Sequence, residues 1–546
     1  MQWYIAVWMA CVVAALPVRR GHATEGPVPS RHFAEWFDSR DRSEDGLLHQ
    51  FRLINYFFVR GIASNTRSDP IGTRGLSLGP IGRPTTPVGD GEAFLAEQRW
   101  IPILSATPFF TDGWGEFRAM FEIDATWAFA ANGVQPNQGA GFGSRQVNIQ
   151  TKDVYAAIFP TQDPSELSIL IGTQPLFDSI YNPHTTPPFE LINSGYKLSV
   201  LGGDATGIAA YGELFGVLGK LAFVPLTVSQ PNKAENGDPG FAFAYLTTLD
   251  AGLFVQPGTF LGLTYWYLRD DTEGLGFAVE GLVRSGPSSL GLAALNGHGA
   301  MNISRPRGYV HYLGFNFHHN LRFHTGPLSA SGFVLVNSGR FKARDDRSPN
   351  PNVRILGVAA NLEANYNYGK TPDDTLSLEL MGTNGDDDPT DDIQRGPFTL
   401  NNYGLASATW VDTKTLILFP FSSTATNYNG AVNDIHNQGY GVVAIIGSAS
   451  HDFIPYKLNL KLGIATGMSF AKPKHFAAEE SSDASSGKRG RMIGTELNVE
   501  MKYHIRYAMT VGVHAAVLLK GDFYHESPYV VATPWAAFTT FTWVLF

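Results

Sequence analysis

The chain has 546 residues, of which 44% are hydrophobic and only 16% are charged, together with 58 glycines and 33 prolines. Its formal net charge of −9 at pH 7 argues against nucleic acid as a partner. Beyond the N-terminus no run of about 18 consecutive apolar residues occurs, which argues against helical membrane spans.

Residues 1–23 are predicted to be a secretory signal peptide. The apolar run from Ile5 to Val18 has the length of a signal core, and Gly21-His22-Ala23 offers small residues for cleavage. No Lys or Arg precedes the apolar run, so a short anchor helix remains the alternative. The only cysteine, Cys11, lies in this segment, and its removal would leave no thiol for a disulfide, a zinc site or catalysis.

A polar, irregular segment follows at residues 24–46. It is predicted to be a periplasmic lead-in or a small plug, with a poorly ordered terminus as the alternative. Residues 47–546 are predicted to form one outer-membrane β-barrel. The first strand is expected at Leu47 to Ile62, and the turn-forming residues from Ala63 to Glu92 predict a long external loop.

The stretch from Gly115 to Phe129 alternates between apolar and mostly polar side chains. Because successive side chains of a strand point to opposite faces, this period of two predicts a strand with two differently solvated faces. A half-buried strand of a soluble protein would show the same pattern, but the run also has the length of about 9–11 residues that a transmembrane strand needs. The apolar face comprises Phe117, Ala119, Phe121, Ile123, Ala125, Trp127 and Phe129, and the opposite face comprises Glu116, Arg118, Met120, Glu122, Asp124 and Thr126.

The same alternation recurs along the chain, between spacers of two sizes. Short spacers such as Arg506-Tyr507 indicate tight turns, and long ones such as Gly382 to Gln394 and Ala471 to Met492 indicate external loops. Short turns that alternate with long loops are typical of outer-membrane barrels. Clear further runs lie at Val147–Phe159, Leu313–Phe323, Val358–Tyr368, Leu458–Met468 and Ile493–Tyr503, with Tyr155, Ala157 and Phe159 assigned to the apolar face of the first.

These observations predict an all-β fold, a single transmembrane antiparallel β-barrel of about 18 strands, within a range of roughly 16–20. Barrels of about this size enclose an aqueous lumen. Phe538 to Phe546 is predicted to be the last strand, and it ends the chain on an aromatic residue. This ending resembles the C-terminal signal of outer-membrane barrels, which implies the barrel-assembly machinery as a partner.

If the apolar faces contact lipid, the opposite faces line the lumen and set its selectivity. Cations and anions are equally frequent on these faces, so no excess of one sign is predicted. Asparagine and glutamine are common among the other lumen residues, and their amides suit neutral hydroxylated solutes. The predicted pore-lining residues are Glu116, Arg118, Glu122, Asp124, Lys152, Asn316, His318, Arg322, Glu363, Lys461, Glu496, Glu500 and Lys502.

Two polar clusters suggest other functions. His311, His318, His319 and His324 crowd one predicted strand, but no cysteine or acid lies on that strand to complete a metal site, which favours hydrated histidines. Asp386 to Asp392 is rich in aspartate, but its spacing differs from that of a calcium-binding loop, which favours a solvated acidic loop. Serine and histidine are scattered and nothing marks a nucleophile elbow, so no enzyme, metal or cofactor is predicted.

A family resemblance rests on the segment between Val147 and Tyr181. It involves Gln150, Lys152 and Tyr155, then the run from Leu167 to Gln174, and then Leu176 and Asp178. These residues resemble the early strands of outer-membrane porins of the alginate-export-like group, although Thr173 stands where that group has arginine. The resemblance implies a monomeric barrel of about 18 strands that passes sugars, polysaccharide or small polar solutes.

The sequence as a whole predicts a porin-like channel in the outer membrane of a Gram-negative-type cell. Small polar solutes, neutral or sugar-like, would diffuse through it passively. The other expected partners are outer-membrane lipid and lipopolysaccharide. The alternatives are a polysaccharide-export barrel, a structural or adhesive barrel plugged by its own loops, and an outer-membrane enzyme.

Overall fold

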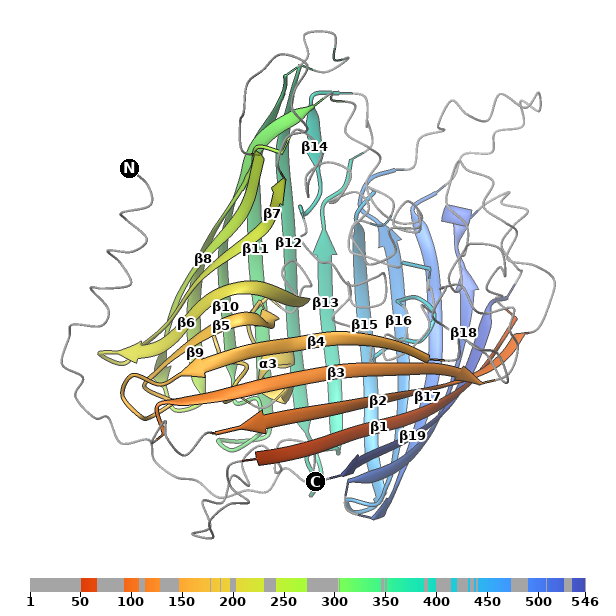
Figure 1. Ribbon diagram of the computed structural model, residues 1–546. Coiled ribbons are helices and arrows are strands. Elements are labelled where there is room, and N and C mark those ends of the chain that lie inside the picture. The colour runs from red at the N-terminus through yellow and green to blue at the C-terminus, as the bar shows by residue number, and fades with distance from the viewer. Residues whose placement is uncertain are drawn as a thin grey trace, which may run out of the picture.

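The chain folds into one β-barrel (Figure 1). The computed structural model describes residues 51–65, 93–107, 113–127, 147–176, 178–186, 188–196, 203–229, 242–272, 303, 305–344, 348, 351–386, 391–398, 414–419, 431–432, 437, 440–472, 490–506, 508–524 and 533–545. Its wall strands are β1 (Phe51–Ser64), β2 (Ala93–Ala106), β3 (Gly115–Trp127), β4 (Val147–Ile158), β5 (Leu167–Leu176), β6 (Gly203–Leu214), β7 (Val217–Ser229), β8 (Ala242–Gln256), β9 (Thr259–Asp270), β10 (Pro306–His319), β11 (Leu328–Ala343), β12 (Asn352–Asn367), β13 (Thr375–Thr383), β15 (Val442–Ile454), β16 (Leu458–Ser469), β17 (Met492–Arg506), β18 (Met509–Lys520) and β19 (Trp535–Leu545).

The wall is continuous. Each strand pairs antiparallel with its neighbours along the chain, and β19 pairs with β1 from Asn55 with Leu545 to Ser64 with Ala536, which closes the sheet. The described part of the chain thus supplies 18 wall strands, which confirms the predicted all-β antiparallel barrel. The predicted segments 1–23 and 24–46, and the terminal Phe546, lie outside the described residues.

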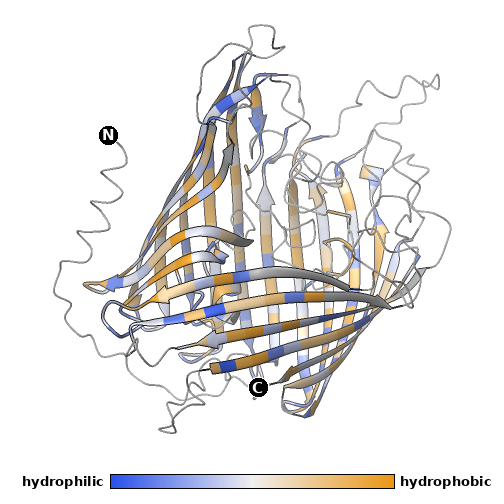
Figure 2. Cartoon of the chain, in the orientation of Figure 1, coloured by the Kyte–Doolittle hydropathy of each residue, from blue (hydrophilic) through white to orange (hydrophobic). Residues whose placement is uncertain are grey.

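The two faces of the wall differ in exposure as the alternating pattern predicts. On β12, Leu356 and Leu362 point outward and are each 48% exposed, whereas Ile355 and Glu363 point inward and are 2% and 5% exposed. Figure 2 shows hydrophobic and hydrophilic residues alternating along the strands. Covering outward apolar area with lipid stabilises it by about 25 cal/mol per Å², so the exterior fits a membrane.

The two rims of the barrel carry links of different length. One rim, here called the turn rim, holds the links of two to eight residues. The start of the first strand, Phe51, and the end of the last strand, Leu545, also lie at this rim. The link between β6 and β7 is Phe215-Gly216, with φ of 54° and 79°, the left-handed pair that a two-residue hairpin requires. The other rim, here the loop rim, holds most of the long links, including 271–305 between β9 and β10. In outer-membrane barrels the short turns are periplasmic.

Two regions depart from simple wall strands. β14 (Ile393–Arg395) pairs parallel with β12 beyond the end of the short β13, so part of the predicted Gly382–Gln394 loop belongs to the sheet. A short helix, α3 (Pro188–Asn193), lies inside the barrel outline in Figure 1. Among the helices of the described residues, none is long and apolar enough to cross a membrane.

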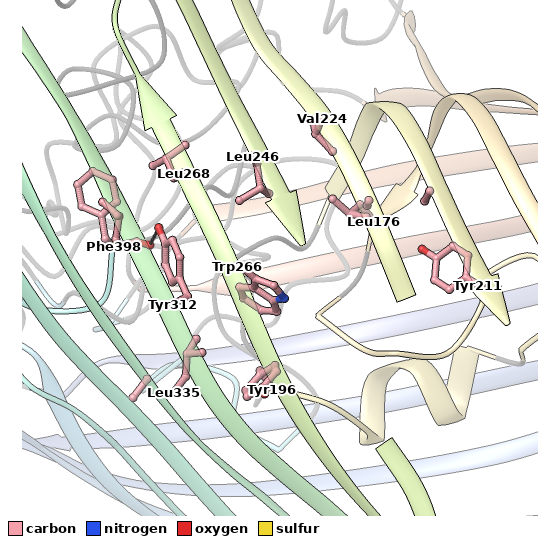
Figure 3. Close-up of a cluster of buried hydrophobic side chains, with 14 of the residues drawn as sticks. Leu176, Tyr196, Tyr211, Val224, Leu246, Trp266, Leu268, Tyr312, Leu335 and Phe398 are labelled. Atoms are coloured by element: carbon pink, nitrogen blue, oxygen red, sulfur yellow. Dashed lines mark hydrogen bonds between the residues drawn. The ribbon is translucent and has the colours of Figure 1, made fainter. Parts of the chain in front are cut away.

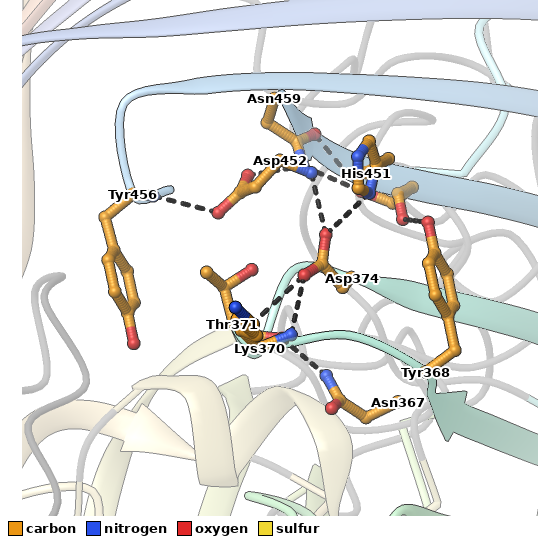
Figure 4. A network of polar contacts seen from close by, with 10 residues as sticks. Asn367, Tyr368, Lys370, Thr371, Asp374, His451, Asp452, Tyr456 and Asn459 are labelled. Carbon is orange, nitrogen blue, oxygen red and sulfur yellow. Dashed lines mark hydrogen bonds and ion pairs between the residues drawn. The ribbon is translucent and has the colours of Figure 1, made fainter. Parts of the chain in front are cut away.

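A polar network ties two turns together at the turn rim (Figure 4). The Asp374 carboxylate accepts hydrogen bonds from the backbone N–H groups of Asp452 at 2.8 Å and Lys370 at 2.9 Å, and it lies 2.9 Å from His451 Nδ1. Tyr368 stacks on the His451 ring and donates to the Ser450 carbonyl at 2.8 Å. The network therefore fixes the turn before β13 against the end of β15.

Acid is expected to loosen these turns. Burial raises the pKa of Asp374, but the backbone hydrogen bonds and His451 outweigh burial and hold it below its usual value. Since the folded-state pKa is depressed, the stabilisation is complete above the unfolded pKa of about 3.9 and is lost as pH falls through the folded value. Replacing Asp374 with Asn should cost about 2 kcal/mol at pH 7. Unfolding in urea should show this difference at pH 7 and a smaller difference once the pH falls below about 3.9; an equal difference at both pH values would contradict the assignment.

Candidate functional site: the lumen and its two inserts

Most of the predicted pore-lining residues lie on the inner face of the wall. On β3, Glu116, Arg118 and Glu122 share one face, and Arg118 stands opposite the buried Tyr155 of β4. Arg322 lies beyond β10 in a turn. The side chains of Asp124 and Lys152 lie outside the described ones. The remaining members are Asn316 and His318 of β10, Glu363 of β12, Lys461 of β16, and Glu496, Glu500 and Lys502 of β17.

One face assignment on β4 is wrong. The register with β3 shifts between Met120, opposite Asp153, and Phe121, opposite Thr151, so one residue of β4 is bulged. A bulge reverses which side chains face inward beyond it. Tyr155, Ala157 and Phe159, predicted to face lipid, are therefore buried inside the barrel, and Val154 and Ile158 are exposed in their place.

A first insert enters the lumen from the loop rim, comprising residues 178–186 and 188–196 between β5 and β6. Its His184 is fully buried, with Nδ1 3.0 Å from the Tyr155 hydroxyl and Nε2 3.3 Å from Glu116 Oε2. Arg118 pairs with Glu116 at 3.2 Å and donates to the His184 carbonyl at 3.5 Å. Two predicted lumen charges thus anchor the insert to β3.

The far side of the first insert packs against β9, β10 and β11. Tyr196 lies edge-on to Trp266, with ring centroids 5.3 Å apart (Figure 3). Its ring also lies edge-on to that of Phe333, with centroids 5.6 Å apart. Gly314 of β10 makes this approach possible, because a Cβ there would lie 2.5 Å from the Tyr196 ring. These rings belong to a cluster of buried hydrophobic residues on the inner face. The lumen is therefore dry on this side, contrary to the expectation of a uniformly wet inner face.

Polar contacts extend the same attachment. The Lys220 ammonium of β7 is fully buried and donates to the Ser179 carbonyl of the insert at 2.9 Å. The Tyr181 hydroxyl lies 2.8 Å from His318 Nε2, and the His318 ring stacks on Phe260 at 5.1 Å. Arg322 pairs with Glu190 of α3. The first insert is therefore held by contacts with β3, β4, β7, β9, β10, β11 and the turn after β10.

A second insert, residues 414–419, enters between β13 and β15. Its Leu416, Ile417 and Leu418 donate their backbone N–H groups to the Glu496 carboxylate of β17, at 2.8, 2.9 and 2.6 Å. The side chains of these residues are at most 4% exposed, in a second buried cluster that includes Phe523. Glu496, predicted to line the pore, instead anchors an apolar segment within it.

Lys414 begins the second insert and bridges two carboxylates of the wall. Its ammonium pairs with Glu363 of β12 at 3.0 Å and with Glu379 of β13. Burial lowers the pKa of Lys414, but attraction by Glu379 and Glu363 exceeds this effect and raises the pKa above its ordinary value. Lys414 therefore stays charged at neutral pH, and the predicted pore residue Glu363 is neutralised by it.

A polar path crosses the four neighbouring strands β16 to β19. Glu500 of β17 lies 3.3 Å from the Lys461 ammonium of β16, 2.8 Å from that of Lys502, and 2.9 Å from His514 Nδ1 of β18. His514 Nε2 in turn lies 3.2 Å from the Thr540 hydroxyl of β19. Lys502 is 42% exposed, so this group meets solvent.

The crowded histidines do not form one site. His318 faces inward, whereas His311 lies on the outer face, 2.8 Å from the Tyr265 hydroxyl, and His319 lies on that face with Nδ1 2.7 Å from Thr259. In the acidic segment, Arg395 pairs with Asp386 at 3.3 Å and with Asp391. Within the described part of the chain, no group of three or more His, Cys, Asp or Glu could hold a metal ion.

Comparison with known proteins gives distant structural likenesses. No family model and no curated protein matches the chain. Pseudomonas aeruginosa OccK2 (OpdF), solved in complex with glucuronate, is 10% identical over 92% of this chain and 99% of its own, with a TM-score of 0.46. A BenF-like porin from Pseudomonas fluorescens Pf-5 is 10% identical over 92% of this chain and 100% of its own, with a TM-score of 0.46. Acinetobacter baumannii OccAB4 is 10% identical over 91% of this chain and 99% of its own, with a TM-score of 0.42. The more specific resemblance to the alginate-export-like group finds no support in these likenesses.

Proposed function

We propose that this protein is an outer-membrane channel for the passive diffusion of small polar solutes, neutral or sugar-like. The observation that supports this most is a closed wall of 18 strands with an apolar exterior and an interior rich in paired charges. Barrels of about this strand number leave a lumen wide enough for water. The proposed transport needs no catalysis, cofactor or metal.

The two inserts attach to different arcs of the wall. The first insert contacts β3, β4, β7, β9, β10 and β11, and the second contacts β12, β13, β16 and β17. Polar side chains of the predicted set border both. We propose that solutes pass between the inserts, along Arg118, Lys461, Glu500 and Lys502.

The route is expected to be weakly ion-selective. Inward carboxylates have cationic partners: Glu122 lies 2.7 Å from Arg99, Glu363 pairs with Lys414, and Glu500 pairs with Lys461. Paired charges leave little net field to favour one sign of ion. The reversal potential across a salt gradient should therefore be close to zero. A strongly anion-selective potential would favour the alternative of polysaccharide export.

Conductance of the purified protein in a planar bilayer tests the channel itself. Stable, ohmic single-channel steps are expected, together with swelling of vesicles in small neutral sugars. A barrel that inserts but stays silent at every voltage would contradict the proposal. Assembly by the barrel-assembly machinery is proposed to use β19, whose truncation should abolish insertion.

A plugged structural barrel is the second candidate, and one observation favours it. Both inserts bury apolar side chains in the interior, with Tyr196 1% and Ile417 0% exposed. Apolar residues buried this deeply stabilise a fixed position, because exposing an aromatic or aliphatic side chain costs about 1.5–3 kcal/mol. The silent result above would support this second candidate.

A further inference from the structure

Five basic side chains project outward from four adjacent strands at the loop rim. Arg269 lies near the end of β9, Arg307 near the start of β10, Arg340 and Lys342 near the end of β11, and Arg354 near the start of β12. Each belongs to the outward set of its strand, since its inward neighbours are buried. The five cations therefore form one patch on the outer wall, here the rim cluster.

The strand register places like charges directly opposite one another. Arg307 pairs across strands with Lys342, and Arg340 pairs with Arg354. Like charges in such positions are destabilising by themselves. Two acids among the described residues lie beside the cluster. Asp271 is 2.7 Å from Arg269, and Asp392, just before β14, is 3.5 Å from Arg354. The register thus brings cations side by side at this edge of the wall, and an external anion would reduce their repulsion.

The outward residues below the rim cluster change character with depth. On β9 the outward order toward the rim is Leu263, Tyr265, Tyr267, Arg269, and on β10 it is Leu313, His311, Tyr309, Arg307. The Tyr267 and Tyr309 rings stack across the two strands, with centroids 6.5 Å apart. Apolar, then aromatic, then basic is the order of hydrocarbon, interface and anionic headgroups in a membrane.

We propose that the rim cluster binds the phosphate groups of a phosphorylated glycolipid of the outer leaflet, with the acyl chains on the apolar wall below. Guanidinium groups present paired N–H donors that match phosphate oxygens, and four of the five cations are arginines. Leu263 and Leu313, 64% and 66% exposed, would contact the acyl chains of the same lipid. This binding is separate from the proposed transport.

Native mass spectrometry of the purified protein with diphosphoryl lipid A tests the inference. Wild-type protein should retain the lipid. The triple variant R340Q/K342Q/R354Q should bind it roughly 100-fold more weakly, because each cation near a charged surface contributes about 5-fold. Dephosphorylated lipid A with the same acyl chains should bind the wild-type protein as weakly as lipid A binds the triple variant. Equal binding of both lipids, or by both proteins, would overturn the proposal, as would complete displacement by inorganic phosphate, which would indicate a site for soluble anions.

Two controls separate recognition from folding and from general charge. The variant K370Q/R506Q removes two cations from the opposite rim and should bind lipid A as wild type does. The charge-preserving variant R340K/K342R should retain most of the binding. A loss in K370Q/R506Q as large as in R340Q/K342Q/R354Q would mean that net charge alone is responsible. Conductance should be unchanged in all these variants.

Discussion

Replacing Glu496 with Ala should release the second insert and increase conductance. Glu496 is fully buried, and its carboxylate accepts three backbone N–H groups of the insert and the Asn498 amide at 2.8 Å. Each hydrogen bond to a charged group contributes about 1.5–3 kcal/mol, so the insert should lose about 3 kcal/mol or more. The population with the insert displaced then rises roughly 100-fold.

Single-channel recording detects this change as longer or larger open steps. Glu213, exposed near the turn after β6, provides the matched control, and Glu213→Ala should conduct as wild type does. Susceptibility of the insert to added protease should rise in Glu496→Ala only. Conductance and cleavage identical to wild type would show that Glu496 does not hold the segment.

Replacing Lys220 with Met should destabilise the whole barrel. The Lys220 ammonium is fully buried, 3.7 Å from Asp250, whose carboxylate also accepts the Trp266 Nε1–H at 3.0 Å. Removing one partner of a buried pair leaves an uncompensated charge, at a cost of about 3–5 kcal/mol. The Ser179 carbonyl of the first insert loses its donor as well.

A double variant distinguishes this mechanism from lost packing. In K220M/D250N the uncompensated charge is absent, so most of the stability measured by urea unfolding in lipid vesicles should return. Lys472, which is exposed, serves as the control, and Lys472→Met should change stability little. A double variant as unstable as K220M would assign the loss to packing of the Lys220 stem and not to charge.

The alternation of apolar and polar side chains was sufficient to predict the strands of the wall. It did not predict correctly, for every strand, which side chains face the lumen and which face lipid. On β12 the period of two is uninterrupted, and Leu362 lies outside as expected. On β17 the period holds only between two register shifts, where Leu497 lies outside. On β4 a single bulged residue moved Tyr155 from the predicted outer face to the interior. Bulges depend on register with a neighbouring strand, so a pattern within one strand does not reveal them.

The inserts could not be placed from the pattern, because they are neither strands nor regular helices. One signal was present: the run Leu416 to Phe419 is wholly apolar within a long, otherwise polar link, which indicates burial somewhere. Only the fold shows that its partner is Glu496, 78 residues further along from Leu418. Some of the charges predicted to line the lumen, such as Glu496 and Glu116, therefore hold the inserts in place. The sequence did not predict the position of these inserts.

The central claim is that the inner face of this barrel lines a water-filled path while the next residue along the strand faces lipid. Block of single-channel current by a charged thiol reagent tests it, using single cysteines in a chain with Cys11→Ser. Asn498, which faces inward, and Leu497, which is 45% exposed on the outer wall, are adjacent on β17. The expected result is stepwise block of Asn498→Cys and none of Leu497→Cys. Equal responses of the two variants, or a barrel without current, would contradict the account.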